Sequence, residues 1–125
     1  VEGNMRPILH CLCRQCTRWT GYSVMATAAK SESLHITGED NISWYMSSDW
    51  AERGFCRLCG SNLFWRMPES GEVSIMAGTL TPPTGLKIAA HIYIEDKCDF
   101  VEISDDAPQL RKDELEKLDE LIGEY

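Results

Sequence analysis

Cysteines in two short motifs form the pattern best suited to chemistry. Cys11, Cys13 and Cys16 make a CxCxxC run, and Cys56 and Cys59 make a CxxC pair. Thiolates spaced by one or two residues in tight turns are typical ligands of a tetrahedral zinc ion. In a reducing compartment such spacings favour metal coordination over disulfides or free thiols. The two motifs therefore predict thiolate-bound zinc.

The number of ligands decides what such a zinc ion does. A structural zinc has four protein ligands, whereas a catalytic zinc keeps one position open. The thiols of Cys11, Cys13 and Cys16 predict an open site, where a substrate thiol becomes both the fourth ligand and the nucleophile. Cys56 and Cys59 need two further ligands. The alternative is one zinc ion that joins Cys56 and Cys59 to two upstream sulfurs, which leaves no ordinary catalytic centre.

Several other side chains have a functional and a structural interpretation. We expect His10 to lie beside the ligands or at the surface rather than to be a ligand. His91 can act as a proton shuttle near zinc, because histidine titrates near neutral pH, although a structural hydrogen bond is the favoured interpretation. Arg53 can clamp a substrate carboxylate or form an ion pair. Cys98 is expected to be a spare, partly buried thiol. We expect three tryptophans to lie in the core or at its rim, or to form the wall of a pocket: Trp44, Trp50 and Trp65.

Short strands separated by turns must position these side chains. Alternating apolar residues predict strands at the end of 1–9 and over 22–29, 34–38, 42–46, 61–66, 72–76, 88–94 and 101–103. Residues 34–46 are expected to form a hairpin, 47–55 a polar loop, and 14–20 a helical turn that Gly21 ends. This pattern is typical of an all-β sandwich or open barrel.

The last twenty residues differ in character. Asp106 can cap a helix on which Leu110, Leu115, Leu118 and Ile122 recur at helical spacing. We therefore expect a zinc-binding β domain over 1–105 and an acidic C-terminal helix over 106–125. The helix is expected to pack on the domain or extend from it, and docking to another subunit, as in a homodimer, is the alternative.

Composition excludes some partners. The formal net charge is −8 at pH 7, which disfavours nucleic acid because phosphate binding relies on lysine and arginine. No apolar run approaches the ~20 residues of a membrane span, and no signal peptide is evident. We expect a soluble, cytoplasmic protein without a membrane partner. The chain opens at Val1 and its first methionine is Met5, which suggests a processed or upstream-cut polypeptide.

The motifs and their surroundings resemble the glutathione-dependent formaldehyde-activating enzyme family, which also includes centromere protein V. The resemblance covers most of residues 5–103. It lies in the run from Cys11 to Gly21, Ser47-Ser48, the run from Arg53 to Phe64, Gly78-Thr79-Leu80 and His91-Ile92-Tyr93.

The resemblance implies a β-tent of twisted antiparallel sheets with one or two zinc ions. Cys11, Cys13 and Cys16 would bind the catalytic zinc, and Cys56 and Cys59 would supply half of a structural site. The implied activity is that of a carbon–sulfur lyase, which condenses glutathione with formaldehyde to S-hydroxymethylglutathione. Two departures stand out: the family completes its structural site with an earlier CxCG pair, and it usually has histidine where Leu12 stands.

Three functions are consistent with these patterns. The first is an enzyme that activates glutathione or another small thiol for addition to formaldehyde or a related aldehyde. The second is a non-catalytic, zinc-stabilised module that binds a protein. The third is hydrolytic or reductive chemistry at the same zinc. The thiol motifs contain no carboxylate to serve as a general base, which disfavours a hydrolase.

Overall fold

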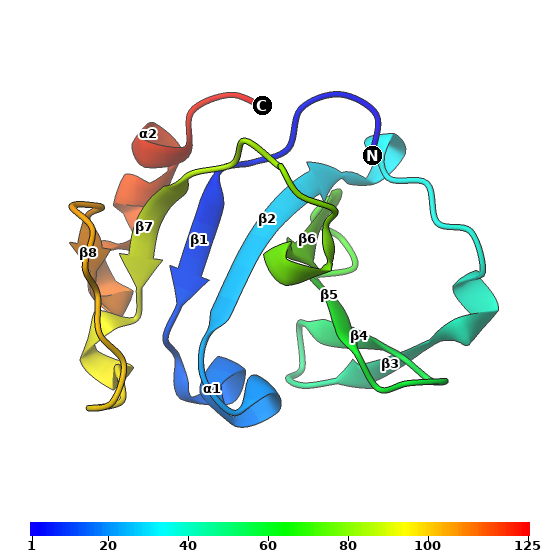
Figure 1. The fold of residues 1–125 in the computed structure, drawn as a ribbon, viewed down its shortest axis with the longest axis horizontal. Coiled ribbons are helices and arrows are strands. Elements are labelled where there is room, and N and C mark those ends of the chain that lie inside the picture. The colour runs from blue at the N-terminus through cyan, green and yellow to red at the C-terminus, as the bar shows by residue number, and fades with distance from the viewer.

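A single eight-stranded sheet is the framework of the molecule (Figure 1). The computed structural model describes residues 1–125. The strands are β1 (Ile8–Cys11), β2 (Val24–Lys30), β3 (Ile42–Met46), β4 (Glu52–Cys56), β5 (Asn62–Arg66), β6 (Glu72–Met76), β7 (Ile88–Ile92) and β8 (Gln109–Leu110). Their order in the sheet is β3-β4-β5-β6-β2-β1-β7-β8. In Figure 1, β3 and β4 run across the direction of β1, β2 and β7.

The sheet is mixed rather than wholly antiparallel. β1 pairs in parallel with β7, and β7 in parallel with β8, whereas the other neighbours are antiparallel. The prediction of a mainly β chain with a C-terminal helix is confirmed. The parallel pairs depart from the purely antiparallel sheets that the family resemblance implied.

The helices are short and lie at the two ends of the chain. α1 (Arg14–Thr20) begins after Cys13 and ends at Gly21, whose φ of 84° is left-handed. Its predicted extent is confirmed. Near the C-terminus, a 3-10 segment η5 (Lys112–Lys117) leads into α2 (Leu118–Ile122). Neither helix has the length and apolar composition that crossing a bilayer requires.

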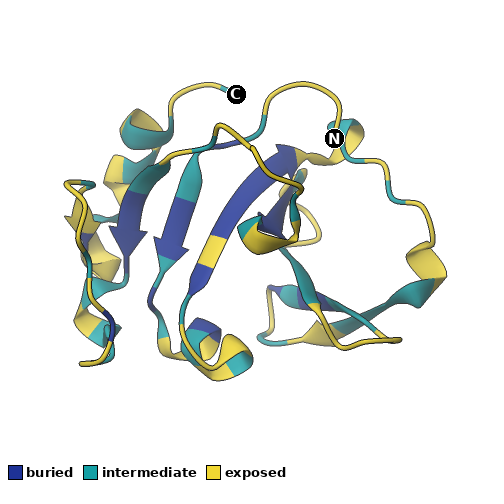
Figure 2. Cartoon of the chain, in the orientation of Figure 1, coloured by how far each residue is buried: buried dark blue, intermediate teal, exposed yellow.

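The central strands carry the core. Figure 2 shows burial concentrated along β1, β2 and β7. One cluster joins Leu9, Ala90, Ile92 and Leu110 across β1, β7 and β8, and a second includes Cys16 with Val24, Ala26 and Met76. Because side chains alternate between the two faces of a strand, Leu9 and Cys11 face the opposite side from His10.

The predicted hairpin over 34–46 is wrong. Residues Ser31–Ser33 and Glu39–Asn41 form 3-10 turns, and β3 pairs with β4 instead. The segment 47–51 makes the turn between β3 and β4. Ala51 O accepts the backbone N–H of Ser47, and Ser48 Oγ accepts the backbone N–H of Ala51. The expected polar loop over 47–55 is therefore half turn and half strand, and its second half positions Arg53.

Two predicted strands later in the chain also differ. β7 ends at Ile92 rather than 94, because Tyr93 adopts a left-handed conformation with a φ of 57° and starts a 3-10 turn over Ile94–Asp96. The strand predicted over 101–103 is absent. Val101 is nevertheless buried, and its backbone N–H donates to Cys98 O at 3.1 Å.

The C-terminal helix starts later than the sequence predicted. Asp106 does not cap it: the segment after Asp106 forms β8, and the N-cap is Arg111, whose N–H donates to Glu114 Oε1 at 3.0 Å. The backbone of residues 108–110 pairs with β7 at the edge of the sheet, since Pro108 O accepts the N–H of His91. The helical segments then pack on the first core cluster through Leu115, Leu118, Leu121 and Ile122.

Candidate metal centre

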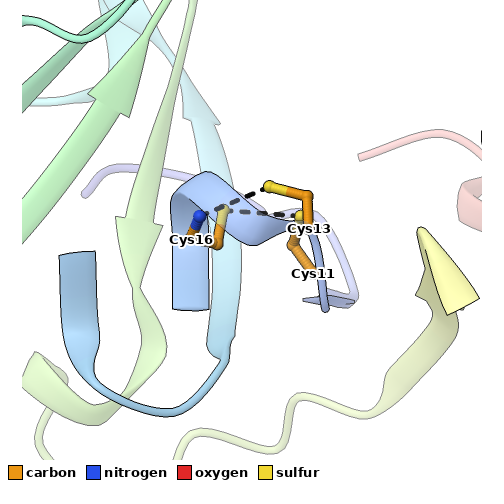
Figure 3. A group of neighbouring side chains, drawn as sticks. All are labelled: Cys11, Cys13 and Cys16. Carbon is orange, nitrogen blue, oxygen red and sulfur yellow. Dashed lines mark hydrogen bonds between the residues drawn. The ribbon is translucent and has the colours of Figure 1, made fainter. Parts of the chain in front are cut away.

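Three thiols converge between the end of β1 and the first turns of α1 (Figure 3). The sulfurs of Cys11, Cys13 and Cys16 all lie within 4.8 Å of one another, and Cys16 Sγ is 3.4 Å from Cys11 Sγ. Zinc–sulfur bonds of about 2.3 Å in tetrahedral geometry place sulfurs about 3.8 Å apart. The spacing of the three sulfurs therefore fits three corners of a zinc site.

Local structure explains the convergence. Cys13 is the N-cap of α1, and its sulfur accepts the backbone N–H of Cys16 at 3.4 Å. Between the first two cysteines, Leu12 is only 1% exposed, and its N–H donates to Ile92 O at 3.0 Å. Leu12 thus anchors the segment to the core, so that Cys11 and Cys13 turn toward Cys16.

A buried arginine faces the thiols. Arg53 on β4 is 4% exposed, and its two terminal nitrogens lie 3.8 and 3.7 Å from Cys16 Sγ. Its guanidinium also lies over the Trp19 ring, 4.9 Å from the centroid. It has no carboxylate within salt-bridge distance. A buried cation without an acidic partner is costly, so the arrangement favours negative charge on the cysteines. This fits thiolates that hold a metal cation.

The thiols influence one another strongly. Hydrogen bonds from the Cys11 and Cys16 thiols lower the pKa of Cys13, and Arg53 lowers it further. The pKa of Cys11 is raised, chiefly through its hydrogen bond with Cys13. The three thiols thus share their protons, and a negative charge on Cys13 is stabilised by the other two thiols and by Arg53.

The cluster opens into a cavity of about 570 Å³ on the same face of the sheet. Cys11, Cys13 and Cys16 all line it. The cavity gives the cluster an open side from which a small molecule can reach the sulfurs. Three protein ligands with an open side are typical of catalytic rather than structural zinc.

Cys56 and Cys59 are not part of this cluster. Neither belongs to the group of three sulfurs, and neither lines the cavity. They flank the β4–β5 turn, where the N–H of Gly60 donates to Cys56 O at 2.7 Å. Ser61 Oγ lies 3.1 Å from Cys59 Sγ and lowers the pKa of that exposed thiol. The structure thus does not bring the two motifs together on one ion, and metal binding by Cys56 and Cys59 stays a prediction. Cys98 also lies outside the cluster.

His10 and His91 meet on the other face of the sheet. Their Nδ1 atoms lie 2.7 Å apart, and both side chains are buried. Each ring has one further partner: His10 Nε2 is 2.7 Å from Ser23 Oγ, and His91 Nε2 is 2.7 Å from Asp105 Oδ1. Neither histidine lines the cavity, so His91 has the structural hydrogen bonds that were the favoured interpretation.

The partners fix the protons in this chain of four residues. A carboxylate only accepts, so His91 Nε2–H donates to Asp105. For neutral rings, His10 Nδ1–H then donates to His91 Nδ1, and Ser23 Oγ–H donates to His10 Nε2. Burial lowers the pKa of His10, and the nearby His91 lowers it too, which favours the neutral ring. The network ties β1 to β7 and to the loop that carries Asp105.

Several cavity residues escaped the sequence reasoning. Arg14 directly follows Cys13, and this position in the sequence was the only indication that Arg14 would lie at the cavity. Arg6 and Glu72 form an ion pair at 3.2 Å although 66 positions separate them, and both line the cavity. Leu115 and Leu118 were predicted as the packing face of the tail, and they also form cavity wall.

Comparison with known proteins identifies the class. Residues 1–96 match the profile of the family described as glutathione-dependent formaldehyde-activating enzyme, and the chain belongs to this family. It is also similar to a protein of Schizosaccharomyces pombe (strain 972) that is named an uncharacterized lyase. The two are 26% identical over 108 residues, which cover 86% of this chain and 78% of that protein.

Proposed function

We propose that this protein is a lyase-like enzyme that joins a thiol, such as glutathione, to formaldehyde or a related small aldehyde. The family membership and the lyase-named relative support the general class. The observation that carries the proposal is the cluster of Cys11, Cys13 and Cys16, which opens into a cavity and has the buried Arg53 beside it.

The three cysteines would hold zinc, and their chemistry fits it. Zinc bound there supplies a soft Lewis acid that lowers the pKa of a substrate thiol. In the addition, a bond forms between sulfur and the aldehyde carbon, the C=O π bond breaks, and the proton lost by the thiol ends on the oxygen. The reverse reaction breaks the same carbon–sulfur bond.

The chain's own residues supply charge and placement. Arg53 offsets the negative charge of the three thiolates, which would otherwise weaken binding of an anionic substrate sulfur. The cavity wall restricts water around the sulfurs, because apolar side chains on β2, β6 and β7 face it: Val24, Ala26, Met76 and Ile92. Holding both reactants in this space reduces the entropic cost of bringing them together.

The test is thiol-dependent aldehyde consumption by the zinc-loaded protein. Cys13→Ser should lose at least about a hundredfold in rate, because removing a ligand disrupts the open site. Cys98→Ser is the matched control, since Cys98 lies outside the cluster. Equal rates for Cys13→Ser and the unmodified protein would reject the proposal and favour the zinc-stabilised binding module.

A further inference from the structure

The cavity suggests a larger and less polar substrate than formaldehyde. We propose that it takes a thiol–aldehyde pair in which one partner carries an apolar body. This body is an alkyl chain or an aromatic ring, and that partner carries no more than one anionic group. The inference rests on the proposed function, because the reacting sulfur is placed at Cys11, Cys13 and Cys16. It adds which chemical class the remainder of the cavity recognises.

The first observation is the apolar wall that continues away from the sulfurs. Trp65 on β5 and Met76 on β6 form one part of it, and Leu115 and Leu118 of the C-terminal segments form another. These elements come from distant parts of the chain, and they meet over one face of the sheet. An apolar wall of this kind gains free energy by removing a hydrocarbon group from water.

The second observation is apolar surface left open at the cavity. Met67 is 39% exposed and Trp50 is 58% exposed, and both line the cavity. Trp50 also contacts the edge of Trp65, with ring centroids 5.9 Å apart. Exposed aromatic and thioether groups around a hollow mark a ligand site, because a folded chain gains by covering them.

The third observation is size. Formaldehyde has two heavy atoms, whereas a cavity of about 570 Å³ lies in the range of sites for much larger ligands. Neither a one-carbon aldehyde nor the charged, polar body of glutathione would place a hydrocarbon group against the apolar wall. An apolar substituent on the reacting carbon or sulfur would cover that wall.

The fourth observation is the charge that the cavity can satisfy. Of its three arginines, Arg6 is paired with Glu72, and Arg53 faces Cys16 Sγ. Arg14 is exposed and has no acidic partner within salt-bridge distance. Glutathione carries two carboxylates and an ammonium group at neutral pH. Arg14 can pair with one carboxylate of a ligand, whereas a second carboxylate would find no free cation, and Asp96, which also lines the cavity, adds a negative charge.

Two kinetic series on the zinc-loaded protein test the proposal. The first varies the aldehyde from propanal through butanal to octanal with 2-mercaptoethanol fixed, so that the intrinsic reactivity of the carbonyl stays nearly constant and the thiol carries no carboxylate. The second varies the thiol from 2-mercaptoethanol to butanethiol and 2-phenylethanethiol with formaldehyde fixed. In the series whose partner carries the apolar body, we expect kcat/KM to rise about fourfold per added methylene. Flat or falling values in both series would overturn the proposal and leave the proposed function intact.

A substitution at the cavity wall distinguishes binding in the cavity from a general preference for hydrophobic substrates. Met67→Glu places a charge on the wall. It should lower, at least tenfold, the ratio of kcat/KM for octanal to kcat/KM for propanal. If the thiol carries the apolar body, the ratio for 2-phenylethanethiol to 2-mercaptoethanol should fall instead. Met46→Glu is the matched control, because Met46 is an exposed methionine that does not line the cavity. An unchanged ratio in Met67→Glu would overturn the proposal.

Binding of an unreactive probe gives a readout that is independent of catalysis. Octanoate combines one carboxylate with an alkyl chain, and butanoate shares its head group. Calorimetry should show octanoate binding at least about tenfold more tightly than butanoate, with the preference reduced in Met67→Glu. If octanoate binds in this way while no thiol–aldehyde pair reacts, the proposed function fails and only the class of ligand that the cavity binds stands. No preference for octanoate would overturn the substrate class.

Discussion

At the residue scale, Arg53 constrains the chemistry of the thiol cluster more than any other side chain. Its charge is buried beside Cys16 Sγ and over Trp19, without a carboxylate partner. Zinc with three thiolates carries a net charge of about −1. A single buried cation therefore balances the loaded cluster, whereas three protonated thiols would leave the guanidinium unpaired.

Replacing this charge should weaken metal binding. Arg53→Met keeps much of the volume and removes the cation, so we expect zinc affinity to fall at least about tenfold, which is about 1.4 kcal/mol. Competition with a chelating dye measures the change. Arg111→Met is the control, because Arg111 is exposed and does not line the cavity of the cluster. Equal zinc affinities for Arg53→Met and the unmodified protein would contradict this role.

Asp105 gives a second prediction at this scale, for stability against pH. The hydrogen bond from His91 lowers the pKa of Asp105 in the folded protein. Its stabilising effect should be complete above the unfolded value of about 3.9 and should disappear as pH falls through the lower folded value. Asp105→Asn should therefore reduce the urea midpoint at pH 7, and the difference should vanish in strong acid.

Urea unfolding between pH 2 and 7 measures this difference. Asp106→Asn is the neighbouring control, because no side-chain hydrogen bond or ion pair involves Asp106, and its midpoints should follow the unmodified protein. A gap between Asp105→Asn and the unmodified protein that stays constant into acid would show that the charge of Asp105 has no part in it.

At the scale of elements, the β3–β4 pair determines where Arg53 lies. Trp44 on β3 is opposite Gly54 on β4, next to Arg53. The Trp44 ring stacks on Phe64, with centroids 6.0 Å apart, and the Arg66 guanidinium lies 3.7 Å from its centroid. The ring thus passes over Gly54 between two fixed neighbours.

Adding a methyl group at Gly54 should disturb this pair. A Cβ there would lie 2.9 Å from a Trp44 ring carbon, so Gly54→Ala should destabilise the protein by about 1–3 kcal/mol. Gly78→Ala is the control, because a Cβ at Gly78 meets nothing within 4 Å. Thermal or urea unfolding compares the two variants. A Gly54→Ala protein as stable as Gly78→Ala would mean that the Trp44 ring moves freely.

At the scale of the whole molecule, metal binding and folding should be coupled. The cluster joins β1 to α1, and Arg53 connects it to β4, so an ion there would hold three elements together. A ligand that binds only the folded state stabilises it by about 2.7 kcal/mol at a hundred times its Kd. Chelation should therefore lower Tm by at least about 5 °C, and added zinc should restore it.

The source of this shift can be assigned with two variants. Cys13→Ser should lose the part of the chelator effect that comes from the cluster, and Cys59→Ser should lose any part that comes from the β4–β5 turn. Elemental analysis of each variant gives the matching zinc content. An unmodified protein whose Tm does not respond to chelation would contradict metal binding at either site.

The sequence by itself determined the local features. α1 spans 14–20 and ends at Gly21 as predicted, since a left-handed glycine at a helix end depends on only a few neighbouring residues. The strands over 42–46, 61–66 and 72–76 follow from alternation, which is also local. The spacing of Cys11, Cys13 and Cys16 predicted their convergence for the same reason.

Only the tertiary structure decided which distant segments meet. Alternation gives a strand but not its partner, so 34–38 was matched wrongly to 42–46, whereas β4 supplies that pairing and brings Arg53 to Cys16. The contact between His10 and His91 and the cavity wall from Leu115 and Leu118 likewise depend on how whole elements pack. Such contacts reflect burial summed over the entire sheet, which no short stretch of sequence contains.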